Sequence, residues 1–342
     1  MNYCAFNKNC SIFASAGWQE KFPISEIPYS TILTKRVSKR QKFFYYRIKF
    51  GTNEAVFEFT SSEIDKKAID SVANIIDKLI PTFEDEIERI KVNETQRTKR
   101  LKHNLITHNT MILQEIFNLI PQDVIADKIS NQLQYVSSVI SANSRSVGQA
   151  LIRILKNASL SKAEFDVHEV LYRSDVPALE FDTHRMHKLL KLAFSSFWLD
   201  FLEKKITIQL NESFLNVRID YKTISAVLCH LLDNATKYTL NNTDLHIHIS
   251  LEGNYVVTEF DMISLRIDDD EVGIIFQEHY SGRYAKRLGL EGQGIGMYIV
   301  NKFIRLNNGR IELQRNCVPR NARTIEDIIY EQNRFKLFLP KA

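Results

Sequence analysis

Two stretches near the C-terminus decide the fold, HLLDNATKYT at residues 230–239 and GQGIGMYIV at residues 292–300. The first has the pattern of an amphipathic helix, in which apolar side chains share one face. His230, Asn234 and Lys237 recur at i, i+4 and i+7 on the opposite, polar face. This polar stripe fits either a polyphosphate with its metal ion or a helix face in solvent.

The second stretch places alternate glycines directly before another amphipathic helix. Gly292, Gly294 and Gly296 allow the backbone to approach phosphate oxygens, and a helix N-terminus favours negative charge. The dinucleotide fingerprint has a different spacing, GxGxxG, and follows an early strand with an acidic residue downstream. Here the glycines come late in the chain and follow Arg283 and further basic residues, which argues against a dinucleotide fold.

A third stretch, IDDDEVGI at residues 267–274, follows the apolar strand pattern MISLRI. Acidic residues at a strand end followed by a glycine suit the edge of a base, a cation or an ordinary turn. Taken alone, the residues do not choose among these three.

These stretches, in this order, resemble the motifs of one family. HLLDNATKYT resembles the N-box, IDDDEVGI the G1 box, IFQEHYSGR at 275–283 the F-box and GQGIGMYIV the G2 box of the GHKL nucleotide-binding fold, in its sensor histidine kinase branch. The closing FKLFLP resembles the last strand of that branch. The resemblance covers residues 181–342 and implies an α/β sandwich of the Bergerat type, with a lid between the F and G2 boxes that closes over ATP.

The resemblance also implies roles at the phosphate end of the site. Asn234 is expected to bind Mg²⁺ through its amide oxygen, and Lys237 and Tyr238 to contact phosphates. Arg283, Lys286 or Arg287 is expected to neutralise the γ-phosphate. The three glycines at 292, 294 and 296 are expected to form the lid hinge and the phosphate cradle.

At the base end, Asp269 is expected to accept the adenine amino group, with Gly273 beneath the base. Two residues depart from the family pattern. Glu271 replaces the first glycine of the G1 box, and His230 stands where the kinases commonly carry Asn and the gyrase and chaperone-type ATPases carry a Glu that activates water. The absence of that Glu at position 230 argues against a clamp-type ATPase.

The sequence before residue 181 predicts two further domains, so we expect the full chain to be an α+β multidomain protein. Residues 1–80 read as a small α/β input or docking domain, with a hairpin at FFYYRIKF–GTN–AVFEF and a helix that ends at Pro81. Residues 81–160 read as a helical hairpin that turns at Pro121, with a first helix roughly 55 Å long. Two helices alone cannot enclose a core of this width, so a homodimer with a four-helix bundle is expected.

The first hairpin helix carries HNLITHN at residues 103–109, which resembles the kinase H-box. At 100° per residue, His103 points away from the apolar seam, whereas His108 falls inside it. The resemblance makes His103 the phosphoacceptor, with a merely exposed surface histidine as the alternative. Thr107 fits the motif, and the resemblance implies that its hydroxyl positions water for removing phosphate from a partner. Asn104 replaces the carboxylate that would accept the imidazole proton.

Composition sets the remaining limits. The chain has 342 residues, 44% of them apolar, and a formal charge of +4, which does not indicate nucleic acid. No stretch is apolar enough to span a membrane, and we expect a cytoplasmic protein. The sequence therefore predicts a dimeric histidine kinase that uses MgATP and a response-regulator partner, with a nucleotide-binding pseudokinase scaffold or, thirdly, a conformational ATPase as alternatives.

Overall fold

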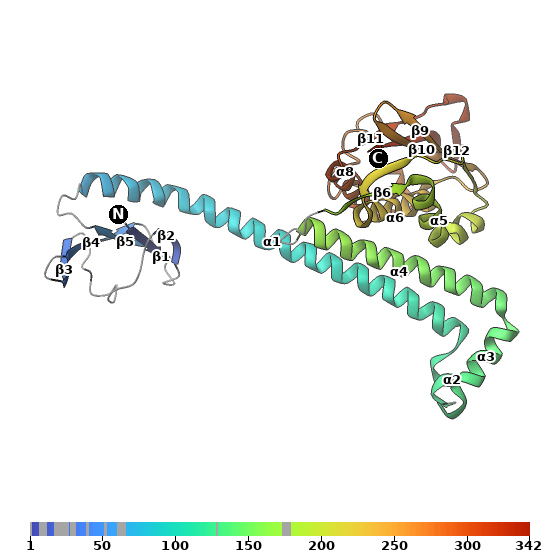
Figure 1. Ribbon diagram of the computed structural model, residues 1–342, viewed down its shortest axis with the longest axis horizontal. Helices are drawn as coiled ribbons and strands as arrows, with labels where there is room; N and C mark the ends of the chain where they lie inside the picture. The colour runs from blue at the N-terminus through green and yellow to red at the C-terminus, as the bar shows by residue number, and fades with distance from the viewer. Residues whose placement is uncertain are drawn as a thin grey trace. The chain divides into compact units, whose positions relative to one another are not determined.

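The computed structural model of the chain describes residues 2–6, 12–16, 27, 32–38, 41–50, 53–59, 66–127, 129–172 and 179–342 (Figure 1). The chain divides into two compact units, residues 1–96 and 97–342. Each unit is described by itself below. None of the helices in the described ranges is long and apolar enough to cross a membrane.

The first unit contains an antiparallel sheet of five strands in the order β2-β1-β5-β4-β3. The strands are β1 (Asn2–Phe6), β2 (Ile12–Ala16), β3 (Ile32–Ser38), β4 (Gln41–Phe50) and β5 (Asn53–Phe59). The predicted hairpin is present, because β4 pairs with β5 up to Phe50 opposite Asn53. Aromatic and β-branched side chains of these two strands, among them Tyr45 and Phe57, are buried.

The helix α1 (Lys66–Leu119) runs for 54 residues without interruption. The prediction that a helix ends at Pro81 is therefore wrong, because α1 passes through that residue. A proline inside a helix has no N–H to donate, so α1 forgoes one backbone hydrogen bond there and continues with the others.

The second arm of the hairpin is divided into α2 (Gln122–Asp127), α3 (Gln132–Ala142) and α4 (Ser144–Tyr172). The first arm ends at Leu119, just before Pro121, as predicted. The last helix continues beyond residue 160, because its C-terminal half packs into the core of the following domain. Leu160, Ala163, Val167 and Val170 of α4 are all at least 92% buried there.

The C-terminal domain is built on a sheet in the order β11-β13-β10-β9-β7, with β12 paired to β13. All of its pairs are antiparallel except β7 with β9. A separate two-stranded sheet joins β6 to β8. The strands are β6 (Phe181–Arg185), β7 (Thr207–Leu210), β8 (Asn216–Asp220), β9 (Asp244–Glu252), β10 (Tyr255–Leu265), β11 (Arg310–Gln314), β12 (Arg323–Ile325) and β13 (Ile328–Pro340).

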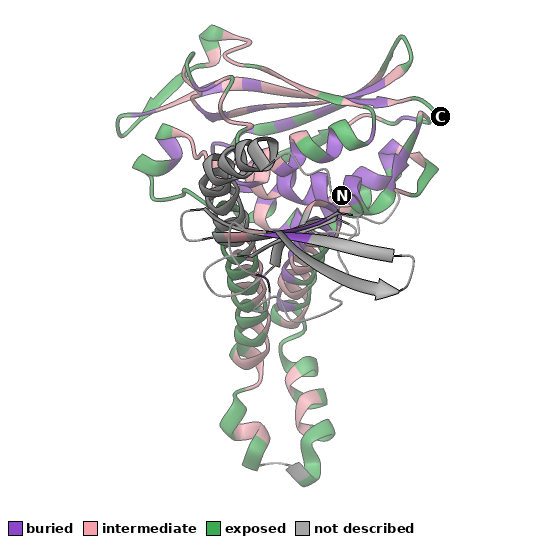
Figure 2. Ribbon diagram, turned by 90° about the vertical axis from the view of Figure 1, so that its left-hand side faces the viewer, coloured by how far each residue is buried: buried purple, intermediate pink, exposed green. Residues whose placement is uncertain are grey.

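Helices pack on one side of this sheet, and the buried residues gather between the two layers (Figure 2). The helices are α5 (Met186–Glu203), α6 (Tyr221–Tyr238), α7 (Arg283–Arg287) and α8 (Gly296–Leu306). Phe197 of α5, Phe260 of β10 and Phe303 of α8 are almost completely buried in the core. An α/β sandwich is thus confirmed for the C-terminal part of the chain.

Candidate functional site

The start of helix α6 is fixed by a buried polar cap. The Asp220 carboxylate accepts a hydrogen bond from the Thr223 N–H at 2.8 Å, which is a standard N-cap. Asn307, at the end of α8, accepts from the Asp220 N–H at 2.7 Å and donates to the Thr223 hydroxyl at 2.9 Å. This side chain is completely buried, so it joins the two helices that carry the candidate motifs.

The polar face of α6 opens into a cavity of about 390 Å³. His230, Asn234, Lys237 and Tyr238 all line it, as the sequence predicts for residues of one site. Lys237 forms an ion pair with Asp233 at 2.5 Å. Burial favours a lower pKa for Lys237, but the Asp233 carboxylate outweighs burial and raises this pKa, so the ammonium group stays charged.

His230 is a buried neutral imidazole. Burial lowers the pKa of His230, against the opposing charge of Glu164. Its Nε2 atom is buried and has no hydrogen-bond partner among the residues described, although the residue lines the cavity. A polar atom left without a partner at a cavity wall is available to a ligand or to water.

The glycine-rich stretch forms another wall of the cavity. Gly292, Gly294 and Gly296 line it, and a Cβ at Gly296 would lie 3.6 Å from the Asn234 amide nitrogen. Gly294 has a positive φ of 68°, and a Cβ there would lie 2.5 Å from the backbone nitrogen of Tyr280. Glycine is therefore required at 294 for both conformation and close approach.

We call residues 281–292 the lid. Its two ends meet where the Ser281 hydroxyl donates to the Gly292 carbonyl at 3.3 Å. The Tyr238 hydroxyl donates to the Leu290 carbonyl of the lid at 3.4 Å. The lid is therefore connected to α6 as well as closed at its own base.

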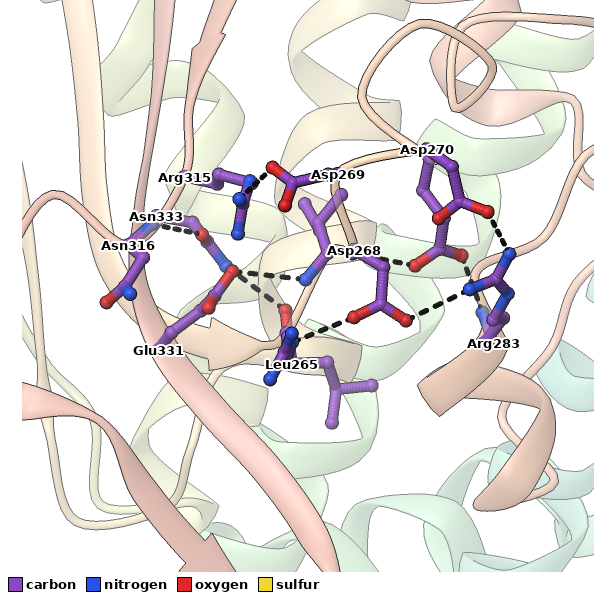
Figure 3. A network of polar contacts seen from close by, with 12 residues as sticks. Leu265, Asp268, Asp269, Asp270, Arg283, Arg315, Asn316, Glu331 and Asn333 are labelled. Atoms are coloured by element: carbon purple, nitrogen blue, oxygen red, sulfur yellow. Dashed lines mark hydrogen bonds and ion pairs between the residues drawn. The ribbon is translucent and has the colours of Figure 1, made fainter. Parts of the chain in front are cut away.

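Three of the predicted nucleotide contacts lie outside the cavity wall, namely Asp269, Gly273 and Arg283. The Asp269 side chain is 85% exposed and forms an ion pair with Arg315 (Figure 3). Arg283 instead forms ion pairs with Asp268 and Asp270. The roles that the resemblance implies for these three residues stay predictions.

The hairpin contributes residues to the same cavity. Asn104 and His108 of α1 line it, together with Glu164 of α4. Gln293, between two of the motif glycines, donates to the Asn104 amide oxygen at 3.0 Å. Sequence reasoning missed the part played by Glu164, because nothing in its local pattern separates it from the other polar residues of a long helix.

His103 is exposed and does not line the cavity. The Thr107 hydroxyl, one turn further on, donates to the His103 carbonyl at 2.9 Å. His108 is half-buried, as expected for a seam position, with its Nδ1 buried and unpartnered within the described ranges. Burial lowers the pKa of His108 and outweighs the opposing effect of the neighbouring Asn157 side chain.

Comparisons with known proteins agree with this geometry. Residues 219–342 match the family model described as histidine kinase-, DNA gyrase B- and HSP90-like ATPase. The sensor protein KdpD of Clostridium acetobutylicum is 25% identical over 162 residues, 47% of this chain and 17% of KdpD. The histidine protein kinase SaeS of Staphylococcus aureus is 30% identical over 101 residues, 27% of each chain. The chain thus spans well under a third of each of these relatives.

Two solved structures are also similar. The catalytic domain of histidine kinase ThkA covers 48% of this chain and 97% of its own, with 20% identity and a TM-score of 0.38. Full-length ShkA in complex with AMPPNP covers 75% of this chain and 46% of its own, with 16% identity and a TM-score of 0.42. Residues 219–342 are thus similar to the histidine kinase-, DNA gyrase B- and HSP90-like ATPase domain, and the α/β sandwich with its motif-lined cavity agrees with that match.

Proposed function

We propose that this chain is a protein-histidine kinase, which uses MgATP to phosphorylate His103 and passes the phosphoryl group to an aspartate of a response regulator. The observation that carries the proposal is the hydrogen bond from Gln293 to Asn104 at 3.0 Å. It brings the glycine-rich wall of the ATP-binding domain against the residue next to His103. The two motifs are 189 positions apart in sequence, so their contact is a property of the fold.

The residues of the cavity fit MgATP. An amide oxygen such as that of Asn234 is a suitable ligand for Mg²⁺, and the Lys237 ammonium is a point charge suited to phosphate. Gly296 leaves space beside Asn234, since a Cβ there would lie 3.6 Å from the Asn234 amide nitrogen, and Gly294 allows the Tyr280 backbone to approach the glycine-rich stretch closely. When bound, MgATP supplies the γ-phosphoryl group, and its metal ion neutralises part of the phosphate charge.

The chain's own residues then perform the transfer. A neutral imidazole nitrogen of His103 forms a bond to the γ-phosphorus as the bond to the oxygen of ADP breaks, and ADP leaves with the electron pair. The imidazole proton goes to water, because Asn104 offers no carboxylate to accept it. His103 is exposed and lies outside the cavity wall, so the hairpin and the ATP-binding domain must move relative to each other for the transfer.

The proposal also covers the oligomeric state of the kinase, a second activity and its location in the cell. A homodimer would cover the apolar side chains that α3 and α4 leave exposed, such as Leu133, Leu151 and Leu155. Thr107 keeps a hydroxyl oxygen that is able to accept a hydrogen bond from water, which supports an additional phosphatase activity toward the partner. We place the reaction in the cytoplasm, where ATP is available.

A second candidate is a nucleotide-binding pseudokinase that switches a partner through ATP occupancy. The position of Asp269 favours it, because this carboxylate pairs with Arg315 outside the cavity instead of facing a base. Asn104, which replaces the expected acidic residue, favours it as well.

One experiment separates the two candidates. The purified chain is incubated with MgCl₂ and γ-labelled ATP, as wild type, His103→Gln and Asn234→Ala. Acid-labile, alkali-stable label that is absent from both variants supports the kinase. Bound nucleotide without label on the protein supports the pseudokinase, and release of phosphate that does not depend on His103 would identify an ATPase instead.

A further inference from the structure

The residue that departs most clearly from the family pattern, Glu271, is also one of the most deeply buried charged groups of the C-terminal domain. Its exposed fraction is 1%. One carboxylate oxygen accepts from the Asp268 N–H at 2.9 Å. The other accepts from the Tyr280 hydroxyl at 2.6 Å and from the Arg283 N–H at 2.9 Å. A buried carboxylate is tolerated only when hydrogen bonds replace its water shell, and these three do so.

The Tyr280 hydroxyl bond matters because Tyr280 forms part of the cavity wall. Burial and the bond to Glu271 raise the pKa of Tyr280 to about 12, so the hydroxyl remains a donor at neutral pH. The backbone of Tyr280 is in close contact with Gly294, and the Lys286 ammonium lies 5.8 Å from the centre of its ring. Glu271 thus holds a wall residue that the glycine-rich stretch also contacts.

The Arg283 N–H bond matters because Arg283 begins α7, the helix of the lid. The Arg283 guanidinium adds ion pairs with Asp268 and Asp270 on the same turn as Glu271 (Figure 3). The Arg283 and Asp270 side chains are 51% and 61% exposed, and exposed ion pairs contribute little to stability. The Asp268 side chain is 21% exposed, but its partner in the ion pair is the same exposed guanidinium. The buried carboxylate is therefore the main connection between the turn at 268–271 and the start of the lid.

We propose that Glu271 is a positioning residue of the nucleotide site, which holds Tyr280 and the first residues of the lid in place before nucleotide binds. It does not line the cavity, so it acts through Tyr280 and Arg283. The inference rests on the proposed function in one respect only, namely that the cavity takes ATP. A site that is already ordered loses less conformational entropy when the ligand binds, so nucleotide affinity depends on this carboxylate.

The test uses the full chain as wild type, Glu271→Ala, Glu271→Gln and the control Asp270→Ala. Asp270 lies on the same turn, but its side chain is 61% exposed and, among the residues that the structure describes, it forms an ion pair only with Arg283. Amide hydrogen exchange is measured without nucleotide over residues 279–292 and over β10 and β13. Binding of a fluorescent ATP analogue is titrated in the presence of MgCl₂.

Glu271→Ala is expected to speed exchange in 279–292 and to weaken binding of the analogue, each about tenfold or more, with exchange in β10 and β13 unchanged. Glu271→Gln is expected to fall between wild type and Glu271→Ala. Its amide oxygen still accepts from Tyr280 and Arg283, but its NH₂ group faces the Asp268 N–H. Asp270→Ala is expected to change both quantities less than about twofold.

The proposal is overturned if Glu271→Ala matches Asp270→Ala in lid exchange, or if exchange accelerates equally throughout the domain. A wild type that binds no analogue would contradict the proposed function, and the exchange measurement would still decide whether Glu271 orders the lid. If the wild type binds the analogue but His103 takes no label from γ-labelled ATP, the kinase reaction is contradicted, and the exchange and binding results still support the role of Glu271.

Discussion

Replacement of Gly294 by alanine should weaken nucleotide binding more than any other single-methyl change in the glycine-rich stretch. The residue has a φ of 68°, and an added Cβ would lie 2.5 Å from the Tyr280 nitrogen and 2.6 Å from the Tyr280 carbonyl oxygen. The left-handed conformation costs a non-glycine residue about 1–2 kcal/mol, and overpacking against atoms that cannot rotate away adds about 1–3 kcal/mol. If the full destabilisation, at least about 2 kcal/mol, falls on the nucleotide-binding conformation of the lid, the Kd for MgATP rises at least about 30-fold.

The assay is equilibrium titration with a fluorescent ATP analogue, with thermal unfolding measured in parallel. Gly253→Ala is a matched control for backbone strain, because Gly253 has a φ of 59° and nothing within 4 Å of its added Cβ. It lies in the turn between β9 and β10, so it should lower stability by about 1–2 kcal/mol and leave the Kd unchanged. Gly292→Ala meets no atom within 4 Å and should raise the Kd only slightly. Equal affinities for Gly294→Ala and Gly292→Ala would refute the reasoning.

Three further changes test other parts of the structure. Asn104→Glu restores a proton acceptor beside His103 and should raise the rate of autophosphorylation about tenfold or more, measured as acid-labile label over time. His230→Asn should reduce the loss of stability at low pH. Burial lowers the pKa of His230 from its ordinary 6.5, so below about pH 6.5 the unfolded chain binds more protons than the folded chain. The free energy of unfolding of the wild type therefore falls as the pH is lowered. Asn307→Ala removes three buried hydrogen bonds and should lower the free energy of unfolding in urea by about 2–4 kcal/mol.

Each of these has its own control or contrary result. A rate for Asn104→Glu at or below wild type would show that no proton acceptor is missing at that position. For His230→Asn, urea unfolding is compared at about pH 5.5 and about pH 7.5, and an unchanged difference between the two would exclude His230 as its source. Asn301→Ala, which loses only an exposed bond from Arg305, should cost under about 0.5 kcal/mol, and an equal cost for Asn307→Ala would contradict the packing described.

The sequence predicted the features of the site that depend on local spacing. The polar stripe of α6 and the glycines before α8 are set by helix periodicity and backbone freedom, and both line one cavity, as expected. The outward position of His103 also follows from helix periodicity. The family match at 219–342 confirms the kind of domain that these motifs indicated.

Features that depend on distant contacts were not predictable. Asp269 faces outward because it pairs with Arg315, a residue 46 positions away whose proximity no motif encodes. Glu164 reaches the cavity only because α4 packs against α6, and the sequence shows no more than a polar residue in a helix. Pro81 predicts a helix end through its strong local preference, and α1 overrides that preference.

The shared core of α4 and the ATP-binding domain has a practical consequence for dissecting this protein. A fragment that began at Phe181 would expose the surface now covered by Leu160, Ala163, Val167 and Val170. Exposed apolar patches of this kind promote aggregation, so such a fragment should be less stable and less soluble than one that begins before Ser144. The minimal independently folding ATP-binding unit of this chain therefore includes an arm of its own hairpin.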